Sequence, residues 1–394
     1  MRIRAEKRVL FVTGGSEVYG AELSLLPVVR RLGPLWKPHF LVERAGPLDT
    51  LLRKEGFPVD RLSLDLNASR VPRVWKVLRL VQLIYLLYIR RIQLVHVNLH
   101  FPAGLVSRAC SFAGIPIVVH VRNMIDEPVS KRFRKYQGII CISQAVQSSL
   151  VTKGKVPLCE IAERLRIIPD GRDLAPFYAG NRERVRKEFG LDPATQLVGM
   201  AARLTSMKGQ DIFLQMAARI KKRMADVRYV LVGTTFSKYD ESYTRDLKKL
   251  VVDLGLQEDV IFAGYRDDMP DVLAAMDCFA HPSRHGAFVS VLIEAMASGL
   301  PIVTSDVDGI PECVGREGSA ILLPPEDPAE WADAVVRVLG DKGFASRMGE
   351  KGRERAARLF EIGPLADLTV EALEAVYGNF YSGASSLRTW TAKG

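Results

Sequence analysis

The sequence has 394 residues, of which 48% are hydrophobic and 25% charged. We expect two domains, because single cores stop growing at roughly 250–300 residues. The composition is ordinary for a globular protein, so disorder is not expected. The net charge of +10 is uneven: residues 1–180 carry 28 basic and 14 acidic side chains, and the remainder carry 27 and 31. The first half therefore either meets an anionic partner or presents a basic, solvated surface.

Five cysteines are present and none forms a CxxC pair; they are Cys110, Cys141, Cys159, Cys278 and Cys313. Several lie in apolar runs, which predicts buried free thiols in a reducing compartment, without a disulfide framework or a zinc site. The first apolar run, residues 9–12, is shorter than the roughly 7–15 residues of a secretory signal. No stretch reaches the ~18 apolar residues of a membrane span. We therefore expect a cytoplasmic protein.

Short β-branched runs alternate with longer helical patterns along the chain. The runs are residues 9–12, 39–42, 94–97, 115–119 and 138–142, then 197–201, 229–232, 260–262, 278–280 and 302–304. Each is almost continuously apolar, as expected for parallel strands that are buried on both faces. The alternation predicts an α/β fold with two Rossmann-like, doubly wound parallel sheets.

The pattern is interrupted by a polar stretch at residues 172–195. We predict an N-terminal Rossmann-like domain over residues 1–175 and a second over residues 176–364. A C-terminal helical segment, residues 365–394, is predicted to pack back towards the first domain. Two such domains facing each other would leave a cleft that is lined by the carboxyl ends of their strands, where ligands bind.

The first motif with chemical content is the segment ARLTSMKG at residues 202–209. Arg203 follows a predicted strand, and Lys208 immediately precedes a helix. Two cations beside the amides of a helix N-terminus suit a diphosphate. As isolated residues, both would be interpreted as ordinary surface charges.

The second motif is the long segment at residues 282–304. A strand ends, a glycine-containing loop follows, and a helix then carries Glu294 near its beginning. Loop amides at residues 286–289 can face an anion or sugar hydroxyls. The Glu294 carboxylate can accept hydrogen bonds from both hydroxyls of a ribose, although a carboxylate there also interacts favourably with the helix dipole.

These motifs resemble the donor-binding domain of glycosyltransferase family 4, a retaining family with the GT-B fold of two Rossmann-like domains. Its hallmark is two glutamates separated by seven residues and running into EAMAxGxPVV; residues 294–303 read EAMASGLPIV. The resemblance covers almost the whole chain, and it implies that residues 1–175 bind the acceptor and residues 176–364 bind the nucleotide-sugar donor. It implies that Arg203 and Lys208 bind the donor diphosphate, that Gly233 marks a strand–turn landmark, and that Tyr265 and Arg266 lie where the chain passes the nucleobase.

The first half carries two further matches to the family. Residues 19–22, YGAE, resemble its GGxE turn, in which a glycine, here Gly20, lets the backbone approach the donor phosphate. His120 matches its histidine at the sugar-transfer site, although a lone histidine at a strand end is more often structural. Residues 169–173, PDGRD, resemble its PNGVD segment, with Asp170 in place of asparagine.

One position departs from the family pattern. The first glutamate of the pair, which in the family lies near the donor sugar, falls at Gly286. The departure implies a different sugar contact, such as His285, or reduced activity; the intact Arg203, Lys208 and Glu294 favour altered donor recognition. The rest of this predicted donor-binding loop is Ala287, Phe288 and Val289.

A helical segment at residues 70–91 is apolar in its middle and basic at both ends; its flanking cations are Arg70, Arg73, Lys76, Arg90 and Arg91. This pattern is typical of an interfacial helix on anionic lipid and also of a buried crossover helix. We interpret residues 78–89 as buried. The flanks, with residues 131–135 (KRFRK), are interpreted as contacts for an anionic membrane or a pyrophosphate-linked acceptor. We expect no nucleic-acid binding, since no such module is recognisable.

The family resemblance implies transfer of a hexosyl group from a UDP- or GDP-sugar to a glycan or lipid-linked acceptor, with retention and without a cofactor or metal. Cell-surface polysaccharide or glycolipid synthesis is the expected setting. Two alternatives stay open at this point. A nucleotide-sugar epimerase has a similar fold, and a non-catalytic partner subunit would account for Gly286.

Overall fold

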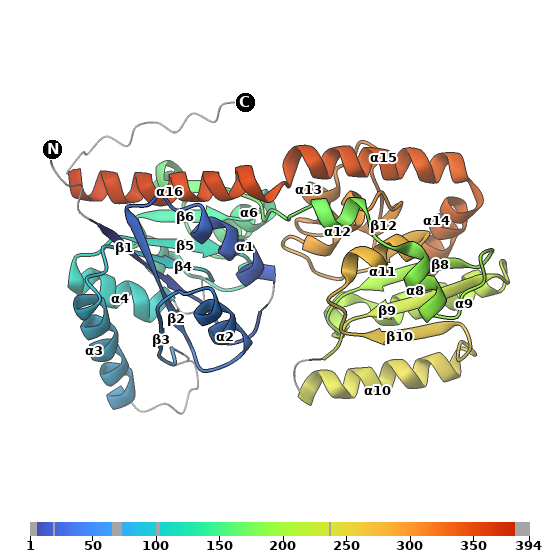
Figure 1. The fold of residues 1–394 in the computed structure, drawn as a ribbon, viewed down its shortest axis with the longest axis horizontal. Coiled ribbons are helices and arrows are strands. Elements are labelled where there is room, and N and C mark those ends of the chain that lie inside the picture. The colour runs from blue at the N-terminus through green and yellow to red at the C-terminus, as the bar shows by residue number, and fades with distance from the viewer. Residues whose placement is uncertain (1–5, 19, 65–72, 100–102, 236–237, 383–394) are drawn as a thin grey trace. The chain divides into compact units, whose positions relative to one another are not determined.

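The computed structural model describes residues 6–18, 20–64, 73–99, 103–235 and 238–382. The chain forms two compact units: a first unit, Met1–Gly171 with Ile362–Gly394, and a second unit, Arg172–Glu361 (Figure 1). Each contains one parallel sheet with helices packed on it, so the predicted pair of doubly wound sheets is confirmed. None of the described helices is long and apolar enough to cross a membrane.

The sheet of the first unit has the order β3-β2-β1-β4-β5-β6-β7. The strands are β1 (Lys7–Val12), β2 (Trp36–Val42), β3 (Val59–Arg61), β4 (Leu94–Val97), β5 (Ile117–Val121), β6 (Gly138–Cys141) and β7 (Leu165–Ile167). The order reverses between β1 and β4, which defines the switch point where open α/β sheets bind ligands. The runs in β4, β5 and β6 are completely buried, as continuous apolar strands in a parallel sheet must be.

Strand β5 begins two residues later than predicted, at Ile117 rather than residue 115. Pro116 precedes it and has no N–H group to donate to a neighbouring strand. The strand also continues beyond residue 119, so that His120 pairs with Ile140 of β6 inside the sheet. The histidine that was predicted to end a strand therefore lies within one.

The helices of the first unit are α1 (Gly20–Arg30), α2 (Pro47–Lys54), α3 (Arg73–Ile89), α4 (Ala103–Ala113), α5 (Ser130–Phe133), α6 (Gln144–Thr152), α7 (Leu158–Ile161) and α16 (Ile362–Ser382). Helix α16 comes from the far end of the chain and lies beside α1 (Figure 1). Its residues Leu365 and Leu373 join Phe11 and Phe40 in one hydrophobic core. The burial of these apolar side chains fixes the C-terminal helix on the N-terminal sheet.

The sheet of the second unit has the order β10-β9-β8-β11-β12-β13, again parallel, and it reverses between β8 and β11. The strands are β8 (Gln196–Ala201), β9 (Val227–Val232), β10 (Val260–Gly264), β11 (Cys278–His281), β12 (Ile302–Ser305) and β13 (Ile321–Leu323). The two sheets therefore share one strand order, since β1 and β8 occupy equivalent places. This order is the dinucleotide-binding one.

The helices of the second unit are α8 (Arg182–Glu188), α9 (Gln210–Lys221), α10 (Lys238–Asp253), α11 (Met269–Ala275), α12 (Ser290–Ala297), α13 (Ile310–Val314), α14 (Pro328–Gly340) and α15 (Lys342–Leu359). Two cores fill this unit, one around Phe213 and Trp331 and the other around Phe279 and Leu292. Helix α14 begins where the Asp327 carboxylate accepts hydrogen bonds from the Ala329 and Glu330 amides, a side-chain cap that satisfies free N–H groups of the first turn.

Candidate functional site

The two motifs singled out in the second half follow adjacent strands at the switch point of the second sheet. Strand β8 ends at Ala201 and leads to Arg203 and Lys208, and β11 ends at His281 and leads to residues 282–289. Strands β8 and β11 are paired directly. The predicted phosphate-binding segment and the predicted sugar-binding loop therefore leave the same edge of the sheet side by side.

Hydrogen bonds tie the two segments together. The Arg284 amide donates to the Met207 carbonyl at 2.9 Å, and the Arg284 guanidinium donates to both carboxylate oxygens of Asp211, at 2.9 and 2.8 Å. A bidentate arginine–carboxylate pair is one of the more directional polar contacts. Arg284 therefore holds the loop after β11 against the beginning of α9.

Two cations lie at this edge. Lys208 is partly buried and its Nζ donates to the His285 carbonyl at 3.5 Å. Its pKa is lowered by burial and by the neighbouring charge of Arg203, and the carboxylate of Asp308 opposes that shift. Arg203 is exposed, and within the described part of the chain no carboxylate pairs with it. The pair presents positive charge that the protein itself only partly neutralises.

Gly233 packs against this segment from the end of β9. Its φ is +132°, and a Cβ atom there would lie 2.0 Å from the Ala202 carbonyl oxygen. Only glycine adopts this backbone without strain. The predicted donor-binding glycine therefore allows the turn after β9 to approach the backbone just before Arg203.

The loop at Gly286 is closed by Asp308. The Gly286 amide donates to Asp308 Oδ2 at 3.0 Å, and His285 Nδ1 lies 3.5 Å from the same oxygen. A Cβ atom at Gly286 would meet Val289 at 2.8 Å and Ile310 at 2.9 Å. The glutamate expected from the family pattern would therefore have to displace both side chains, and glycine at 286 is compatible with the loop as it is folded here.

The rest of the loop leads into α12. Ala287 precedes Phe288, whose ring packs edge-on against Phe360 at 5.6 Å between centroids. Val289 is buried in the core beside α12 and immediately precedes the first residue of that helix. The apolar end of the loop is therefore anchored, while His285 is 64% exposed at its side chain.

Glu294 lies on α12 and accepts a hydrogen bond from Arg172 Nε at 3.1 Å. Both side chains are largely buried, with 17% and 11% of their surface exposed. Burial raises the pKa of Glu294, and the charge and hydrogen bond of Arg172 oppose the rise. The predicted ribose-binding carboxylate is thus held in place by a cation that the sequence did not single out.

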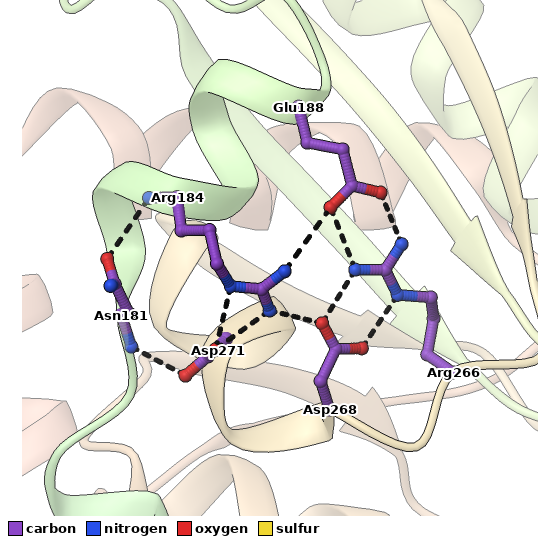
Figure 2. A network of polar contacts seen from close by, with 6 residues as sticks. All are labelled: Asn181, Arg184, Glu188, Arg266, Asp268 and Asp271. Carbon is purple, nitrogen blue, oxygen red and sulfur yellow. Dashed lines mark hydrogen bonds and ion pairs between the residues drawn. The ribbon is translucent and has the colours of Figure 1, made fainter.

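The two residues predicted near the nucleobase differ in their surroundings. Tyr265 follows β10 and is 70% exposed. Figure 2 shows Arg266 in a network of ion pairs. Its guanidinium pairs with Glu188 and donates to both carboxylate oxygens of Asp268 at 2.7 Å. The same two carboxylates also contact Arg184 of α8. Arg266 also holds the pKa of Asp268 below its usual range. The guanidinium predicted to face the base therefore joins α8 to the beginning of α11.

In the first unit, His120 lies in a buried polar cluster. Arg122 Nη2 lies 3.2 Å from His120 Nδ1, Arg122 Nε donates to Asn98 Oδ1 at 3.2 Å, and Arg122 Nη1 pairs with Asp170. Because a guanidinium only donates, Nδ1 must accept and the ring proton must reside on Nε2. Within the described residues Nε2 has no hydrogen-bond partner, so His120 presents one buried N–H donor.

Burial, Arg122 and His96 hold the pKa of His120 well below its usual value, so the ring is neutral. The sequence did not reveal the cluster of His96, Arg122 and Asp170. These residues meet only because β4 pairs with β5 and the segment after β7 places Asp170 beside Arg122. Gly20, the remaining predicted residue of this unit, begins α1, and its carbonyl accepts from Ser24 Oγ at 2.8 Å. Its neighbour Tyr19 lies outside the described residues.

The buried histidines predict a loss of stability on mild acidification. Burial lowers the pKa of His96 and of His281 to about 3, and His120 shifts in the same direction. Below pH 6.5 the unfolded chain binds protons that the folded chain does not, so stability falls as pH falls from 6.5 towards the folded pKa. His96 and His281 are each expected to cost up to about 2 kcal/mol between pH 6.5 and 5, and His120 acts in the same direction.

Urea unfolding at pH 7 and pH 5 measures this loss. His281→Leu is expected to flatten the profile of the second unit only, because His96 and His120 belong to the first. Equal stability of the wild type at the two pH values would contradict the prediction.

Comparison with known proteins identifies two family models that match consecutive halves of the chain. The model described as Glycosyltransferase Family 4 matches residues 18–176, and the model described as Glycosyl transferases group 1 matches residues 181–355. The chain is 29% identical to a D-inositol 3-phosphate glycosyltransferase of Nocardia farcinica over 283 residues, covering 70% of this chain and 62% of that protein. For the same enzyme of Mycobacteroides abscessus the identity is 33% over 218 residues, with coverages of 55% and 46%.

The matched part of the chain thus spans about half to three fifths of the length of these relatives. Among solved structures, Anabaena Alr3699/HepE in complex with UDP is similar with a TM-score of 0.81 and 22% identity, covering 93% of this chain and 99% of that one. WaaG, a glycosyltransferase involved in lipopolysaccharide biosynthesis, is similar with a TM-score of 0.68 and 15% identity, covering 93% of this chain and 99% of that one. At these identities the likeness establishes a shared fold, the GT-B arrangement of two Rossmann-like sheets.

Proposed function

Since the chain belongs to the group 1, or family 4, glycosyltransferases, we propose that it moves a hexosyl residue from a nucleotide diphosphate sugar to an acceptor hydroxyl. The observation that carries the proposal is the placement of Arg203 and Lys208 beside the loop after β11, at the switch point of the second sheet. The solved neighbour from Anabaena was crystallised with UDP and with UDP-glucose, which supports a uridine or other nucleotide donor here.

The proposed chemistry stabilises the group that leaves. As the bond between the anomeric carbon and the diphosphate oxygen breaks, negative charge develops on the diphosphate, and fixed cations lower the energy of that state. Arg203 and Lys208 would supply this charge, so the proposal requires no metal ion. Glu294 would accept hydrogen bonds from the ribose, and His120, whose Nε2–H is buried in this conformation, would donate to the transferred sugar once that N–H becomes exposed. Retention at the anomeric carbon is proposed from the family.

The acceptor is proposed to be a glycan or a molecule that carries phosphate. A lipid-linked pyrophosphate intermediate is one class, in keeping with cell-surface polysaccharide or glycolipid synthesis. The names of several relatives give a second class, a small phosphorylated cyclitol. Both classes are anionic, which agrees with the positive charge of the first half of the chain.

A donor panel tests the proposal. The purified protein is incubated with UDP-, GDP- and ADP-hexoses, with and without acceptors of both classes and with EDTA in a parallel series. Nucleotide release and the anomeric configuration of the product are followed by NMR. Acceptor-dependent transfer with retention, unchanged by EDTA, is expected. Epimerised donor without acceptor would indicate an epimerase, and donor binding without turnover would indicate a non-catalytic subunit.

Glu294→Gln provides a narrower prediction for the ribose contact. Loss of the charge on a hydrogen-bonded acceptor costs about 1.5–3 kcal/mol, so the Kd for UDP is expected to rise at least about tenfold. The Kd for inorganic pyrophosphate, which has no ribose, is expected to stay unchanged. Calorimetric titration of both ligands distinguishes the two roles: equal weakening would show that Glu294 acts only through its ion pair with Arg172.

A further inference from the structure

A large groove lies wholly within the first unit, at the carboxyl edge of its sheet. Its volume is about 1040 Å³. It is lined by the segments that follow β1, β2, β3, β4 and β5, and by parts of α3, α4 and α5. Ligands of open α/β sheets bind at this edge, but none of the residues assigned to the donor lines the groove.

The groove is strongly basic. Among the residues that the structure describes, five cations line it, namely Lys76, Arg108, Lys131, Arg132 and Lys135, against a single carboxylate, Glu43. Within the described part of the chain, none of the five forms an ion pair. Their neighbour Arg134, which does not line the groove, is paired with Glu160 at 2.7 Å.

Unpaired cations such as Lys54 and Lys155 also occur elsewhere in this unit, but in the groove five of them gather around one carboxylate. Like charges held together without a counterion repel one another, and this arrangement is relieved by an anion of matching charge. The other lining side chains include Leu62, Leu64, Leu80, Leu99 and Leu105. A ligand that fits this wall has an anionic group and an apolar or neutral portion beside it.

We infer that this groove binds the phosphate or diphosphate of the acceptor. The inference rests on the proposed function and specifies its acceptor class. Lysine and arginine bind phosphate oxygens through charge-assisted hydrogen bonds, and the arginines Arg108 and Arg132 can do so bidentately. Two sources share this chemistry: a polyprenyl diphosphate in a membrane, and a small phosphorylated polyol in water.

The test compares the double variant Lys131→Gln/Lys135→Gln with a matched control, Lys54→Gln/Lys155→Gln, which removes the same charge from the same unit away from the groove. Each protein is titrated with inositol monophosphate, with phosphatidylcholine vesicles carrying polyprenyl diphosphate, and with UDP. We expect the wild type and the control to bind at least one phosphate probe, and the groove variant to bind it at least about tenfold more weakly.

The probe that binds identifies the source of the phosphate. No affinity of the wild type for either phosphate probe, or equal affinity of groove variant and control, would overturn the inference. Titration with UDP separates this failure from a failure of the proposed function: UDP binding should be the same in all three proteins, and its absence in the wild type would count against the donor site instead.

A second observation concerns the exposed face of α3, the helix that also contributes Lys76, Val77 and Leu80 to the groove. Residues 78–89 were predicted to be buried, but much of this segment is exposed. Large apolar side chains form an exposed stripe at helical spacing, namely Val74, Val77, Val81, Tyr85 and Tyr88, each more than half exposed. Leu83 and Leu87 on the opposite face are buried. Helix α3 packs against α4 (Figure 1), and Phe112 of α4 is also exposed.

The positive charge of this segment favours an anionic partner. Residues 73–91 contain five basic side chains and no acidic one. Two copies of such a face would repel each other, whereas an anionic lipid surface attracts it. An apolar stripe with tyrosines and flanking cations is the pattern of a helix that lies in the membrane interface. We propose that α3 docks the protein on an anionic membrane surface.

Co-sedimentation with vesicles tests this docking. The wild type is expected to bind phosphatidylcholine–phosphatidylglycerol vesicles and not vesicles of phosphatidylcholine alone. Val81→Glu/Tyr88→Glu is expected to weaken binding at least about tenfold, and the control Val252→Glu/Leu368→Glu, exposed apolar positions elsewhere, to leave it unchanged. Equal binding of both variants, no binding by the wild type, or a wild-type dimer that dissociates only in the α3 variant would overturn the proposal.

Discussion

Replacing Arg203 by alanine is expected to lower kcat by about 10²–10³-fold while the protein stays folded. Loss of one preorganised group that stabilises transition-state charge has an effect of this size. Arg203 is exposed and makes no ion pair within the described residues, so its removal leaves no buried group without a partner. The effect should therefore appear in catalysis rather than in stability.

Lys208→Ala should produce a similar loss, because Lys208 and Arg203 lie close enough for the charge of one to lower the pKa of the other. The matched control is Lys222→Ala, which removes an exposed cation after α9 in the same unit. Initial rates at saturating donor and acceptor give kcat, and thermal unfolding checks the fold. Unchanged kcat in Arg203→Ala would remove the central support for the proposed chemistry.

Strands with long apolar runs could be predicted from sequence because burial on both faces leaves a continuous signal. The short strands β3, β7 and β13 were missed, since three residues give no period, and two of them contain arginine. The shift of β5 depends on Pro116, which removes a hydrogen-bond donor. Such boundaries are set by pairing with neighbours rather than by the composition of the run.

The residues proposed to bind phosphate could be grouped from sequence because they follow strands that the topology brings together at one edge of a sheet. Ion-pair partners could not: Arg122 and Asp170 are 48 positions apart, and Arg266 and Glu188 are 78 apart. The same limitation applies to the neighbours of Gly286. Ile310 and Asp308, which contact this loop, lie more than twenty residues later in the chain.

Asp170→Ala is expected to destabilise the first unit by about 3–5 kcal/mol. The Asp170 and Arg122 side chains are 10% and 5% exposed and form an ion pair, and removal of one partner leaves a buried charge without compensation. Asp170 stands where the family pattern has asparagine. The carboxylate is thus matched to the guanidinium of Arg122, which also contacts Asn98 and His120.

Urea unfolding followed by circular dichroism, with hydrogen exchange of the β5 amides to identify the unit that opens, measures the loss. The control is Glu160→Ala, which breaks the exposed pair with Arg134 in the same unit and is expected to have little effect. Equal losses in the two variants would contradict the prediction.

The double variant Arg122→Met/Asp170→Leu is expected to be more stable than Asp170→Ala, because it removes both buried charges together. It should nevertheless lose activity, since the donor that holds His120 Nδ1 is gone and the ring is no longer fixed with its proton on Nε2. Relative to Asp170→Ala, the double variant would then be more stable but less active. That separation would show that the buried charge cluster orients His120 in addition to stabilising the sheet.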